Sequence, residues 1–564
     1  MKVLIVGGVA GGATAAARLR RLNEKAEIII LERSGYVSYA NCGLPYYIGG
    51  IIQEQGTLTL QTPESFWTRF RIDVRVRNEV VAIDPARKTV SICKLETGEI
   101  YEESYDKLIL SPGAKAVKPP LPGIDLEQIF TVRTVEDTLR ARAFVEVQKP
   151  KRAVVVGGGF IGLEMAENLT HMGVSVTIVE KLNQVMSPID YDMACSVHGY
   201  LKSKGITLRL GQSVSGFAEE GNGLLVTLED ETVLQADLVV LAIGVTPDTQ
   251  LAKDAGLALG IRGSIVVNER METSVPDIYA VGDATEAVRY VTGEKALIPL
   301  AGPANKQGRI AADNICGKDS RYKGSLGTSV LKLFDMTIAA AGINEAMAKN
   351  AGISYDKVVT FSAAHAAYYP GATNMTIKTL FDPKDGRILG AQIVGFEGVD
   401  KRMNVLASAI RAKMDAWDLQ ELELSYAPPY SSAKDPVNMA GFVIGNLLDG
   451  TVKQYHWQDV PALQKRSDVV LLDTRTTEEY SRGHIEGTRN IPLDELRERL
   501  GELDKSKTIY VNCQSGLRSY IACRILMQNG FDCYNFSGGY RFYEIVAKDG
   551  AFDETPAHGC GIKI

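Results

Sequence analysis

The stretch Val3-Leu4-Ile5-Val6-Gly7-Gly8-Val9-Ala10-Gly11-Gly12, near the start of the chain, decides the fold of its first part. The apolar run predicts a buried strand, the glycines predict a turn, and the Ala-rich stretch to about Leu22 predicts a helix. A second apolar run, Ile28-Ile29-Ile30-Leu31, predicts another strand, which ends at Glu32. Together these elements predict a βαβ unit with parallel strands.

The same design returns further along the chain. Ala153-Val154-Val155-Val156 precedes Gly157-Gly158-Gly159-Phe160-Ile161-Gly162, a helix through Leu169, and a strand Val176-Thr177-Ile178-Val179 that ends at Glu180. Such glycines let backbone N–H groups approach a pyrophosphate at a helix N-terminus, and the acid accepts hydrogen bonds from ribose hydroxyls. The first copy departs from G-x-G-x-x-G because Val9 stands at the middle glycine. Two such units predict two dinucleotide sites, one for FAD and one for a nicotinamide.

Further motifs assign the two sites. The segment Thr273–Asp283 resembles the second FAD motif of flavoproteins with two dinucleotide sites, in which the final acid holds the ribitol. Glu180 favours NADH, whereas the adjacent Lys181 leaves NADPH as the alternative. The residues expected to bind FAD are Gly7, Gly8, Ala10, Gly11, Gly12, Glu32, Arg33, Asn41, Ser111, Gly113 and Asp283. Those expected to bind NADH are Gly157, Gly159, Phe160, Gly162, Glu164, Glu180 and Gly244.

Composition and charge exclude several classes of protein. The 564 residues are 45% hydrophobic and 23% charged, which is typical of a globular chain rather than a disordered or collagen-like one. The net charge of -6, without a basic block, argues against a nucleic acid or an anionic membrane as partner. No apolar run reaches the ~18 residues of a membrane helix, and the N-terminus has no signal-peptide pattern, so we expect a cytoplasmic protein.

Two cysteines lie in motifs that indicate a catalytic role, and Cys42 is the first of them. The surrounding segment, Tyr36–Tyr47, resembles the single-cysteine branch of the pyridine nucleotide-disulfide oxidoreductases, specifically the coenzyme A disulfide reductases, and the resemblance covers residues 1 to about 445. Relatives that form an internal disulfide carry a second cysteine five positions on, where this chain has Tyr47. The redox partner of Cys42 must therefore come from outside the chain.

Two tyrosines extend this resemblance. His365-Ala366-Ala367-Tyr368-Tyr369-Pro370-Gly371 and the segment 424–435 match stretches of coenzyme A disulfide reductases in which tyrosines, here Tyr368 and Tyr426, reach the cysteine of the partner subunit. A phenol can protonate a leaving thiolate. The resemblance therefore implies a homodimer. It also implies coenzyme A-binding roles for Arg18, Arg21, Ser38, Tyr39, Asn41, Gln61 and Arg71.

Cys513 is the second cysteine in a motif that indicates a catalytic role. Val511-Asn512-Cys513-Gln514-Ser515-Gly516-Leu517-Arg518 resembles the active loop of rhodanese sulfurtransferases, over about residues 456 to 545. Backbone N–H groups at the following helix and the Arg518 charge are expected to stabilise a thiolate or persulfide on Cys513. Four residues separate Cys513 from Arg518, whereas phosphatase-like relatives have five, which favours sulfur over phosphate. The cysteine spacings suggest no metal site, and Cys560 near the C-terminus is a weaker reactive candidate.

The predicted fold is α/β, with two Rossmann-like dinucleotide-binding domains, an α+β dimerisation domain and a small α/β rhodanese domain. The expected boundaries are 1–115 and 246–326 for the FAD domain, 116–245 for the NAD(P)H domain, 327–446 for dimerisation, 447–455 for a linker, 456–545 for rhodanese and 546–564 for a tail.

The sequence favours an FAD-dependent NAD(P)H reductase of coenzyme A persulfide, polysulfide or coenzyme A disulfide, acting through Cys42. Two alternatives remain open: an NADH oxidase or peroxidase that uses a cysteine sulfenic acid, and a flavin redox sensor. The sequence does not identify the physiological sulfur donor or the sulfur path between Cys42 and Cys513.

Overall fold

The computed structural model describes residues 1–548, which form two compact units. Unit 1 consists of Met1–Asn183 and Gly205–Gly327, and unit 2 consists of Gln184–Lys204 and the chain from Thr328 on. Cys560 lies outside the described residues. None of the helices in the described range is long and apolar enough to cross a membrane.

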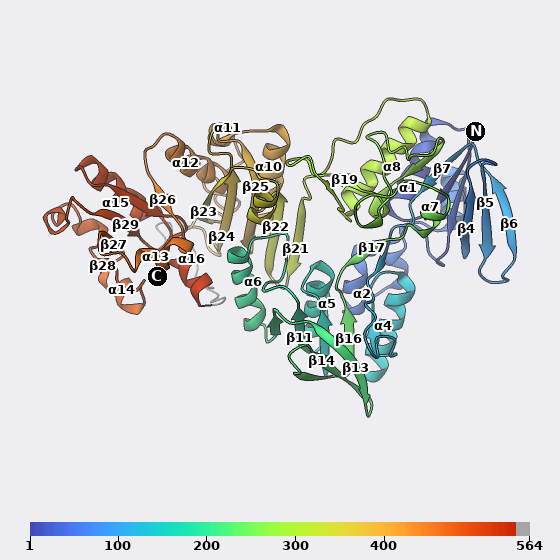
Figure 1. The fold of residues 1–564 in the computed structure, drawn as a ribbon, viewed down its shortest axis with the longest axis horizontal. Coiled ribbons are helices and arrows are strands. Elements are labelled where there is room, and N and C mark those ends of the chain that lie inside the picture. Colours follow the sequence, from blue (N-terminus) through green and yellow to red (C-terminus); the bar gives the residue numbers. More distant parts are fainter. Residues whose placement is uncertain (549–564) are drawn as a thin grey trace. The chain divides into compact units, whose positions relative to one another are not determined.

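The first sheet of unit 1 has five parallel strands in the order β18-β7-β1-β2-β3. Figure 1 labels its strand β7 and the helices α1 and α8 of the same part. Its central strands are apolar and buried, as expected of a parallel sheet covered on both faces. In the sequence, strand β18 comes after the second nucleotide-binding unit. The strands are β1 (Lys2–Val6), β2 (Glu27–Glu32), β3 (Asp73–Val76), β7 (Lys107–Leu110) and β18 (Ile278–Ala280), and the helices α1 (Ala10–Leu22) and α8 (Ala301–Ile315) pack together beside them.

The second sheet of unit 1 repeats this plan, with five parallel strands in the order β12-β11-β10-β16-β9. These are β9 (Ile129–Phe130), β10 (Arg152–Val156), β11 (Ser175–Glu180), β12 (Thr207–Leu210) and β16 (Leu238–Leu241), with helices α4 (Val135–Gln148) and α5 (Phe160–His171). Unit 1 also contains two three-stranded antiparallel sheets, β4-β5-β6 and β13-β14-β15. They comprise β4 (Asn78–Asp84), β5 (Thr89–Lys94), β6 (Ile100–Ser104), β13 (Val214–Glu220), β14 (Gly223–Leu228) and β15 (Val233–Ala236). The predicted pair of Rossmann-like sheets is confirmed.

Unit 2 contains a five-stranded antiparallel sheet in the order β21-β22-β25-β24-β23. All eight residues of β25 are buried, because the strand is covered on both faces. The elements are β21 (Ser329–Leu333), β22 (Met336–Gly342), β23 (Asp356–Ala363), β24 (Asn374–Phe381), β25 (Ile388–Gly395), α6 (Tyr191–Ser203), α9 (Glu345–Asn350), α10 (Val399–Ala412), α11 (Ala416–Glu421) and α12 (Pro436–Leu448). Helix α6 lies between β11 and β12 in sequence but packs within unit 2.

The C-terminal part of unit 2 is a parallel sheet in the order β26-β30-β29-β27-β28. Its elements are β26 (Gln454–Tyr455), β27 (Val469–Asp473), β28 (Arg489–Asn490), β29 (Thr508–Asn512), β30 (Cys533–Phe536), α13 (Val460–Leu463), α14 (Thr477–Arg482), α15 (Leu517–Gln528) and α16 (Gly539–Ala547). The predicted small α/β domain is therefore confirmed. Cys513 directly follows β29, and α15 begins four residues later.

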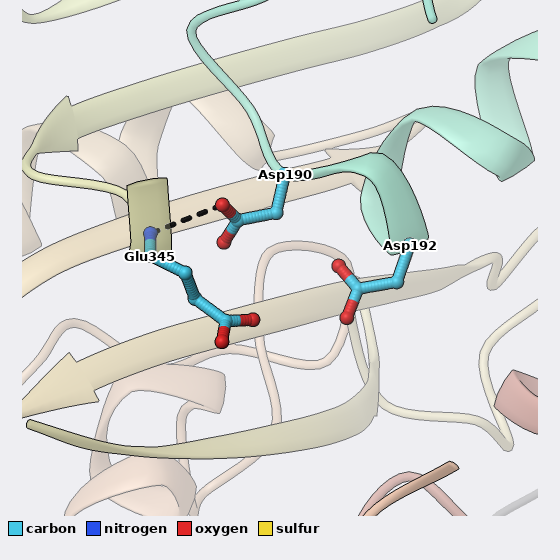
Figure 2. Close-up of side chains that lie close together, drawn as sticks. All are labelled: Asp190, Asp192 and Glu345. Carbon is cyan, nitrogen blue, oxygen red and sulfur yellow. Dashed lines mark hydrogen bonds between the residues drawn. The ribbon is translucent and has the colours of Figure 1, made fainter. Parts of the chain in front are cut away.

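A buried ionic cluster ties α6 to the antiparallel sheet. Asp190, Asp192 and Glu345 bring their carboxylates together, and the backbone N–H of Glu345 donates to Asp190 (Figure 2). The ammonium of Lys378, which is fully buried in β24, lies 2.5 to 3.0 Å from all three carboxylates. The indole N–H of Trp457, from the C-terminal part, donates to Asp192 at 3.1 Å. Lys378, together with Lys357 at 2.8 Å from Glu345, therefore balances part of the negative charge of this cluster, which holds four segments of unit 2 together.

Candidate functional site

The two glycine turns have the same hydrogen-bond geometry. Gly8 N–H donates to the Glu32 carboxylate at 2.8 Å, and the other carboxylate oxygen accepts from the backbone N–H two residues on. Gly158 N–H donates to Glu180 at 2.6 Å, and the second oxygen is again bound by the backbone two residues on. Each acid is thereby fixed at the end of its strand, next to its turn, where a ribose would lie.

These turns fit a pyrophosphate. A Cβ atom on Gly12 would lie 1.9 Å from the carbonyl oxygen of Gly7, and one on Gly162 would lie 1.9 Å from that of Gly157, so each helix packs where only glycine fits. A Cβ on Gly159 would meet nothing within 4 Å, so this side of the turn is open. Neither α1 nor α5 has a side-chain cap, which leaves the N–H groups of their first turns to bind an anion.

Asp283, the expected ribitol-binding acid, follows β18 and forms an ion pair of 2.9 Å with Arg133. Arg133 also donates to the carbonyl of Ala114 at 2.9 Å. In the amide orientation that satisfies both groups, Asn41 accepts from Arg133 at 2.6 Å and donates to its carbonyl at 3.0 Å. Arg133 thus links three segments of the expected FAD site, although no motif in the sequence marks it.

Other expected FAD residues differ in their surroundings. Ser111 N–H donates to the carbonyl of Val6, which sets the strand end beside the first turn, and Gly113 has a positive φ of 73°. Arg33 is paired with Asp248 at 2.8 Å. Gly244, from the nicotinamide set, accepts from Val117 N–H.

Cys42 lies in a short 3-10 turn, Asn41–Gly43, at the start of α2 (Leu44–Ile48), and its side chain is exposed on one side. Partial burial raises the pKa of its thiol above the usual range; the nearby charges of Glu164 and Asp283 raise it further, and Arg133 opposes them. The thiol is therefore protonated at neutral pH in the chain alone.

Glu164 on α5 is the acid of this site with an unusual pKa. Burial raises the pKa of Glu164 to about 7, with a smaller contribution from Glu167, while a hydrogen bond from Tyr46 opposes the rise. The Tyr46 hydroxyl donates to Glu164 at 3.5 Å. Burial and Glu164 together raise the pKa of Tyr46 to about 12. Among these groups, the carboxyl of Glu164 is the one that titrates near neutral pH.

Tyr368 and Tyr426 meet in unit 2. Their hydroxyls are hydrogen-bonded at 2.9 Å, and the side chains are 75% and 49% exposed. This hydrogen bond raises the pKa of Tyr368. The structure thus brings together two phenols that lie 58 positions apart and presents them on the surface of unit 2.

Arg402 holds the two loops that carry these tyrosines. Its guanidinium is almost fully buried and forms an ion pair with Asp435 at 2.9 Å. It also donates to the carbonyl of Ala364, at the start of the Tyr368 loop, and to the hydroxyl of Ser431, in the Tyr426 loop, both at 3.0 Å. Sequence reasoning missed this arginine, because nothing around it in the chain resembles a site.

Cys513 is 1% exposed, and two donors point at its sulfur. Gly516 N–H lies 3.2 Å from Sγ and the hydroxyl of Ser519 lies 3.3 Å from it. The guanidinium of Arg518 forms a two-point ion pair of 2.7 Å with Glu479. The donors at the helix start were expected, whereas Ser519 was not, although it lies in the first turn of the same helix.

Three comparisons identify relatives. Residues 1–308 match the family model for pyridine nucleotide-disulphide oxidoreductases, 328–436 its dimerisation domain, and 456–544 the rhodanese-like domain. The chain belongs to the pyridine nucleotide-disulphide oxidoreductase family. It is therefore an oxidoreductase whose C-terminal part is a rhodanese-like domain, as predicted.

Individual relatives agree with this assignment. A coenzyme A disulfide reductase of Staphylococcus epidermidis is 38% identical over 443 residues, which cover 78% of this chain and 99% of that protein. The reduced CoADR-RHD of Bacillus anthracis has 51% identity and a TM-score of 0.95, over 97% of this chain and 98% of that one. The NAD-dependent persulfide reductase of A. fulgidus has 38% identity and a TM-score of 0.90, over 96% and 100%.

The residues expected to bind coenzyme A in this oxidoreductase do not form one set. Arg18 is tied to Asp313 by two contacts of 2.7 Å, so its charge is already paired. Arg21 is exposed on α1. Arg71 ends α3 (Pro63–Phe70), with its guanidinium 5.4 Å from the ring centre of the exposed Trp67.

Two of the remaining coenzyme A candidates, Ser38 and Tyr39, lie four and three positions before Cys42 in the chain. Ser38 has a positive φ of 49°, and Tyr39 forms an isolated β-bridge with Thr59. Burial and, to a lesser extent, the charge of Glu32 raise the pKa of Tyr39 to about 12. Gln61 accepts a hydrogen bond from the Ser65 hydroxyl at 2.9 Å.

Proposed function

We propose that this oxidoreductase uses NADH to reduce coenzyme A persulfide, polysulfide or coenzyme A disulfide through Cys42, in the cytoplasm. The observation that carries the proposal is that Cys42 has no second cysteine in its motif with which to form a disulfide. All seven cysteines of the described residues are free, and the position five residues after Cys42 is Tyr47. The second sulfur of the redox couple must therefore arrive with the substrate.

Cys42 would attack the coenzyme A sulfur of a persulfide, forming a mixed disulfide with coenzyme A and releasing hydrosulfide. FAD, held at the first glycine turn, supplies the two-electron chemistry that links NADH to the sulfur centre. Residues of this chain bind and orient the two nucleotides: the turns accept the pyrophosphates, and Glu32 and Glu180 accept the riboses. Phe160 and Glu164 border the nicotinamide end of the second turn.

A homodimer is part of the proposal, because the chain has a dimerisation domain. Tyr368 and Tyr426 of one subunit would stand at Cys42 of the other. A hydrogen-bonded pair of phenols can donate to a departing thiolate and share the charge that develops. Their exposure in the single chain leaves them available for this contact.

The rhodanese-like domain would handle sulfane sulfur. The N–H and O–H groups at Cys513 suit a sulfur that carries negative charge, which is the form a cysteine persulfide takes. A fused domain of this kind favours persulfide and polysulfide over disulfide as substrates, because both cysteines would then act on the same form of sulfur.

The experiment is to measure hydrosulfide release and NADH oxidation together, with coenzyme A persulfide as substrate, for the wild type and Cys42→Ser. We expect one hydrosulfide per NADH and loss of turnover in the variant. Oxygen consumption with NADH that far exceeds persulfide turnover would instead identify an NADH oxidase. If hydrosulfide formation stops after a single turnover, the chain acts as a redox sensor.

The tyrosine pair has its own test. Tyr368→Phe removes one hydroxyl from the pair and should lower kcat about tenfold to a hundredfold on coenzyme A persulfide, within the range of general acid catalysis. Tyr369→Phe is the matched control, because it changes the neighbouring phenol, whose ring packs against His365. An equal effect of the two substitutions would exclude the assigned role.

A further inference from the structure

Arg518 is the one charged residue of the loop 513–519, and a carboxylate balances its charge. The guanidinium donates two hydrogen bonds of 2.7 Å to Glu479, and the two side chains are 13% and 15% exposed. The next residue, Ser519, directs its hydroxyl at the sulfur of Cys513 from 3.3 Å. The ion pair therefore belongs to the loop that surrounds this sulfur.

Glu479 is fixed in position from two sides. It lies in the first turn of α14, where its carboxylate accepts from the backbone N–H of Thr476 at 2.9 Å, and its own N–H donates to the Thr476 hydroxyl. Burial raises the pKa of Glu479, but the hydrogen bonds from Arg518 and Thr476 lower it below the usual range. Glu479 is thus ionised at neutral pH and holds the guanidinium of Arg518 by two points.

A second arginine beside the loop is paired in the same way. The side chain of Arg475 is 2% exposed and forms an ion pair of 2.7 Å with Asp473, which is fully buried. Arg475 also donates to the side-chain oxygen of Gln514, the residue after the cysteine, at 3.3 Å. Arg541 approaches the loop through its backbone, whose N–H donates to the carbonyl of Gln514, while its guanidinium lies 5.4 Å from the ring centre of Phe361 in β23. The charge of Arg475 is therefore balanced, as that of the loop arginine is.

We propose that Glu479 determines which sulfur donors react at Cys513: by pairing with Arg518, it favours donors with at most one negative charge beside the transferred sulfur, such as persulfides of thiols, over dianions such as thiosulfate. The inference deepens the proposed function and rests on it. The N–H and O–H groups directed at Cys513 suit one negative charge, that of the sulfur itself. A second negative charge on the donor needs a cation, and the guanidinium of Arg518 is already bound to a carboxylate.

The transfer step balances in atoms and electrons. The Cys513 thiolate attacks the outer sulfur of the donor, so that an S–S bond to Cys513 forms and the bond from the outer sulfur to the rest of the donor breaks. The electron pair leaves with that remainder, as sulfite from thiosulfate or as a thiolate from a persulfide. Cyanide then takes the outer sulfur as thiocyanate and returns Cys513 to the thiolate.

The test compares thiosulfate with methanethiosulfonate, in which a methyl group replaces one charged oxygen. Sulfur transfer to cyanide is measured as thiocyanate with the purified holoprotein, without NADH, for the wild type and Glu479→Gln. Glutamine keeps the size of the side chain and can still accept from Thr476, but it has no charge.

We expect the wild type to prefer methanethiosulfonate. In Glu479→Gln the ratio of kcat/KM for thiosulfate to kcat/KM for methanethiosulfonate should rise about tenfold, because the lost repulsion acts on two charges of the dianion and on one of the monoanion. An unchanged ratio would overturn the proposal, and so would a wild type that prefers thiosulfate.

The matched control is Glu478→Gln. It removes the same charge from the neighbouring position of α14, where the side chain is 74% exposed and pairs with Arg482. The ratio should then equal that of the wild type, and a tenfold rise here would overturn the assignment to Glu479.

A double variant, Glu479→Gln with Arg518→Met, removes both charges of the ion pair. The net charge of the loop is then that of the wild type, so the ratio should return to the wild-type value even where the overall rate falls. A ratio that stays raised in the double variant would show that the Arg518 charge is not the one that Glu479 controls, and the proposal would fail.

The transfer assay also separates this inference from the proposed reduction at Cys42. Cys513→Ser should abolish thiocyanate formation, and transfer that persists in this variant would overturn the inference. A protein that does not reduce coenzyme A persulfide with NADH, yet shows the expected change of donor preference, would overturn the proposed reduction and leave the role of Glu479 established. A protein that reduces coenzyme A persulfide but transfers sulfur from neither donor would overturn the inference alone.

Discussion

Replacing Lys378 by methionine is expected to destabilise unit 2 by about 3 to 5 kcal/mol at pH 7, the usual cost of leaving buried charges without their partner. The Lys378 side chain is 0% exposed, and its ammonium contacts Asp190, Asp192 and Glu345 at 2.5 to 3.0 Å. Methionine has a similar volume and little cavity forms, so the loss of charge dominates the change in free energy of unfolding.

The lowered pKa of Glu345 gives an independent value for the stability that this cluster contributes. Burial alone would raise this pKa, but Lys378 and then Lys357 lower it from 4.5 to about 2. That difference corresponds to about 3 kcal/mol of stability from this carboxylate. The contribution is complete above pH 4.5 and disappears as the pH falls toward 2, because over this range the unfolded state has taken up a proton at this carboxyl and the folded state has not. This value agrees in size with the loss expected for Lys378→Met.

The stability of the Lys378→Met variant should change with pH in the direction opposite to the wild-type contribution of Glu345. Without Lys378 the three buried carboxylates repel one another, so their folded-state pKa values should rise above the unfolded ones. Protonation of these carboxylates removes the repulsion and stabilises the variant as the pH falls. The difference in stability between wild type and Lys378→Met should therefore be largest at pH 7 and shrink by pH 4.

The assay is urea unfolding followed by tryptophan fluorescence in a Trp67→Phe background, in which the remaining tryptophans, Trp417 and Trp457, both lie in unit 2. Lys453→Met is the matched control. Its ion pair with Asp532 is also short, at 2.7 Å, but both side chains are about half exposed, so the loss should stay below about 1 kcal/mol. Equal losses in the two variants, or a difference that persists at pH 4, would refute the reasoning.

Three further predictions follow from close contacts. Gly12→Ala would place a methyl group 1.9 Å from the Gly7 carbonyl and should reduce the FAD content of the purified protein, measured by flavin absorbance. Ser519→Ala removes the 3.3 Å hydrogen bond to Cys513 and should slow sulfur transfer to cyanide about tenfold, with NADH-dependent turnover of coenzyme A persulfide unchanged. Arg402→Met, which leaves its buried partners unsatisfied, should cost about 3 kcal/mol of stability and lower kcat more than it raises KM.

Local patterns predicted the nucleotide-binding folds well. Each βαβ unit spans a short stretch whose glycine spacing, apolar strands and terminal acid are readable from adjacent residues. The Gly8–Glu32 and Gly158–Glu180 hydrogen bonds join residues only 24 and 22 positions apart. Cys42 and Cys513 likewise lie inside continuous motifs, so their neighbourhoods could be predicted.

Contacts between distant segments could not be predicted in this way. Arg133 reaches Asp283 across 150 positions, and Lys378 reaches Asp192 across 186. Arg18 resembles a free cation on an exposed helix face, yet it pairs with Asp313, 295 positions away. No local signal marks these partners, because each is chosen by the packing of elements whose adjacency the sequence pattern leaves undetermined.

The two cysteines proposed to react, Cys42 and Cys513, have different surroundings. Cys513 is buried, and Gly516 and Ser519 already direct an N–H and an O–H at its sulfur, so a negative charge there is stabilised by groups of its own loop. Cys42 is exposed on one side, and its carboxylate neighbours oppose a thiolate. We therefore expect the groups that favour a thiolate there to arrive with the substrate and with the second subunit. An isolated chain would then keep the Cys42 thiol protonated until the site is assembled, and a protonated thiol resists oxidation.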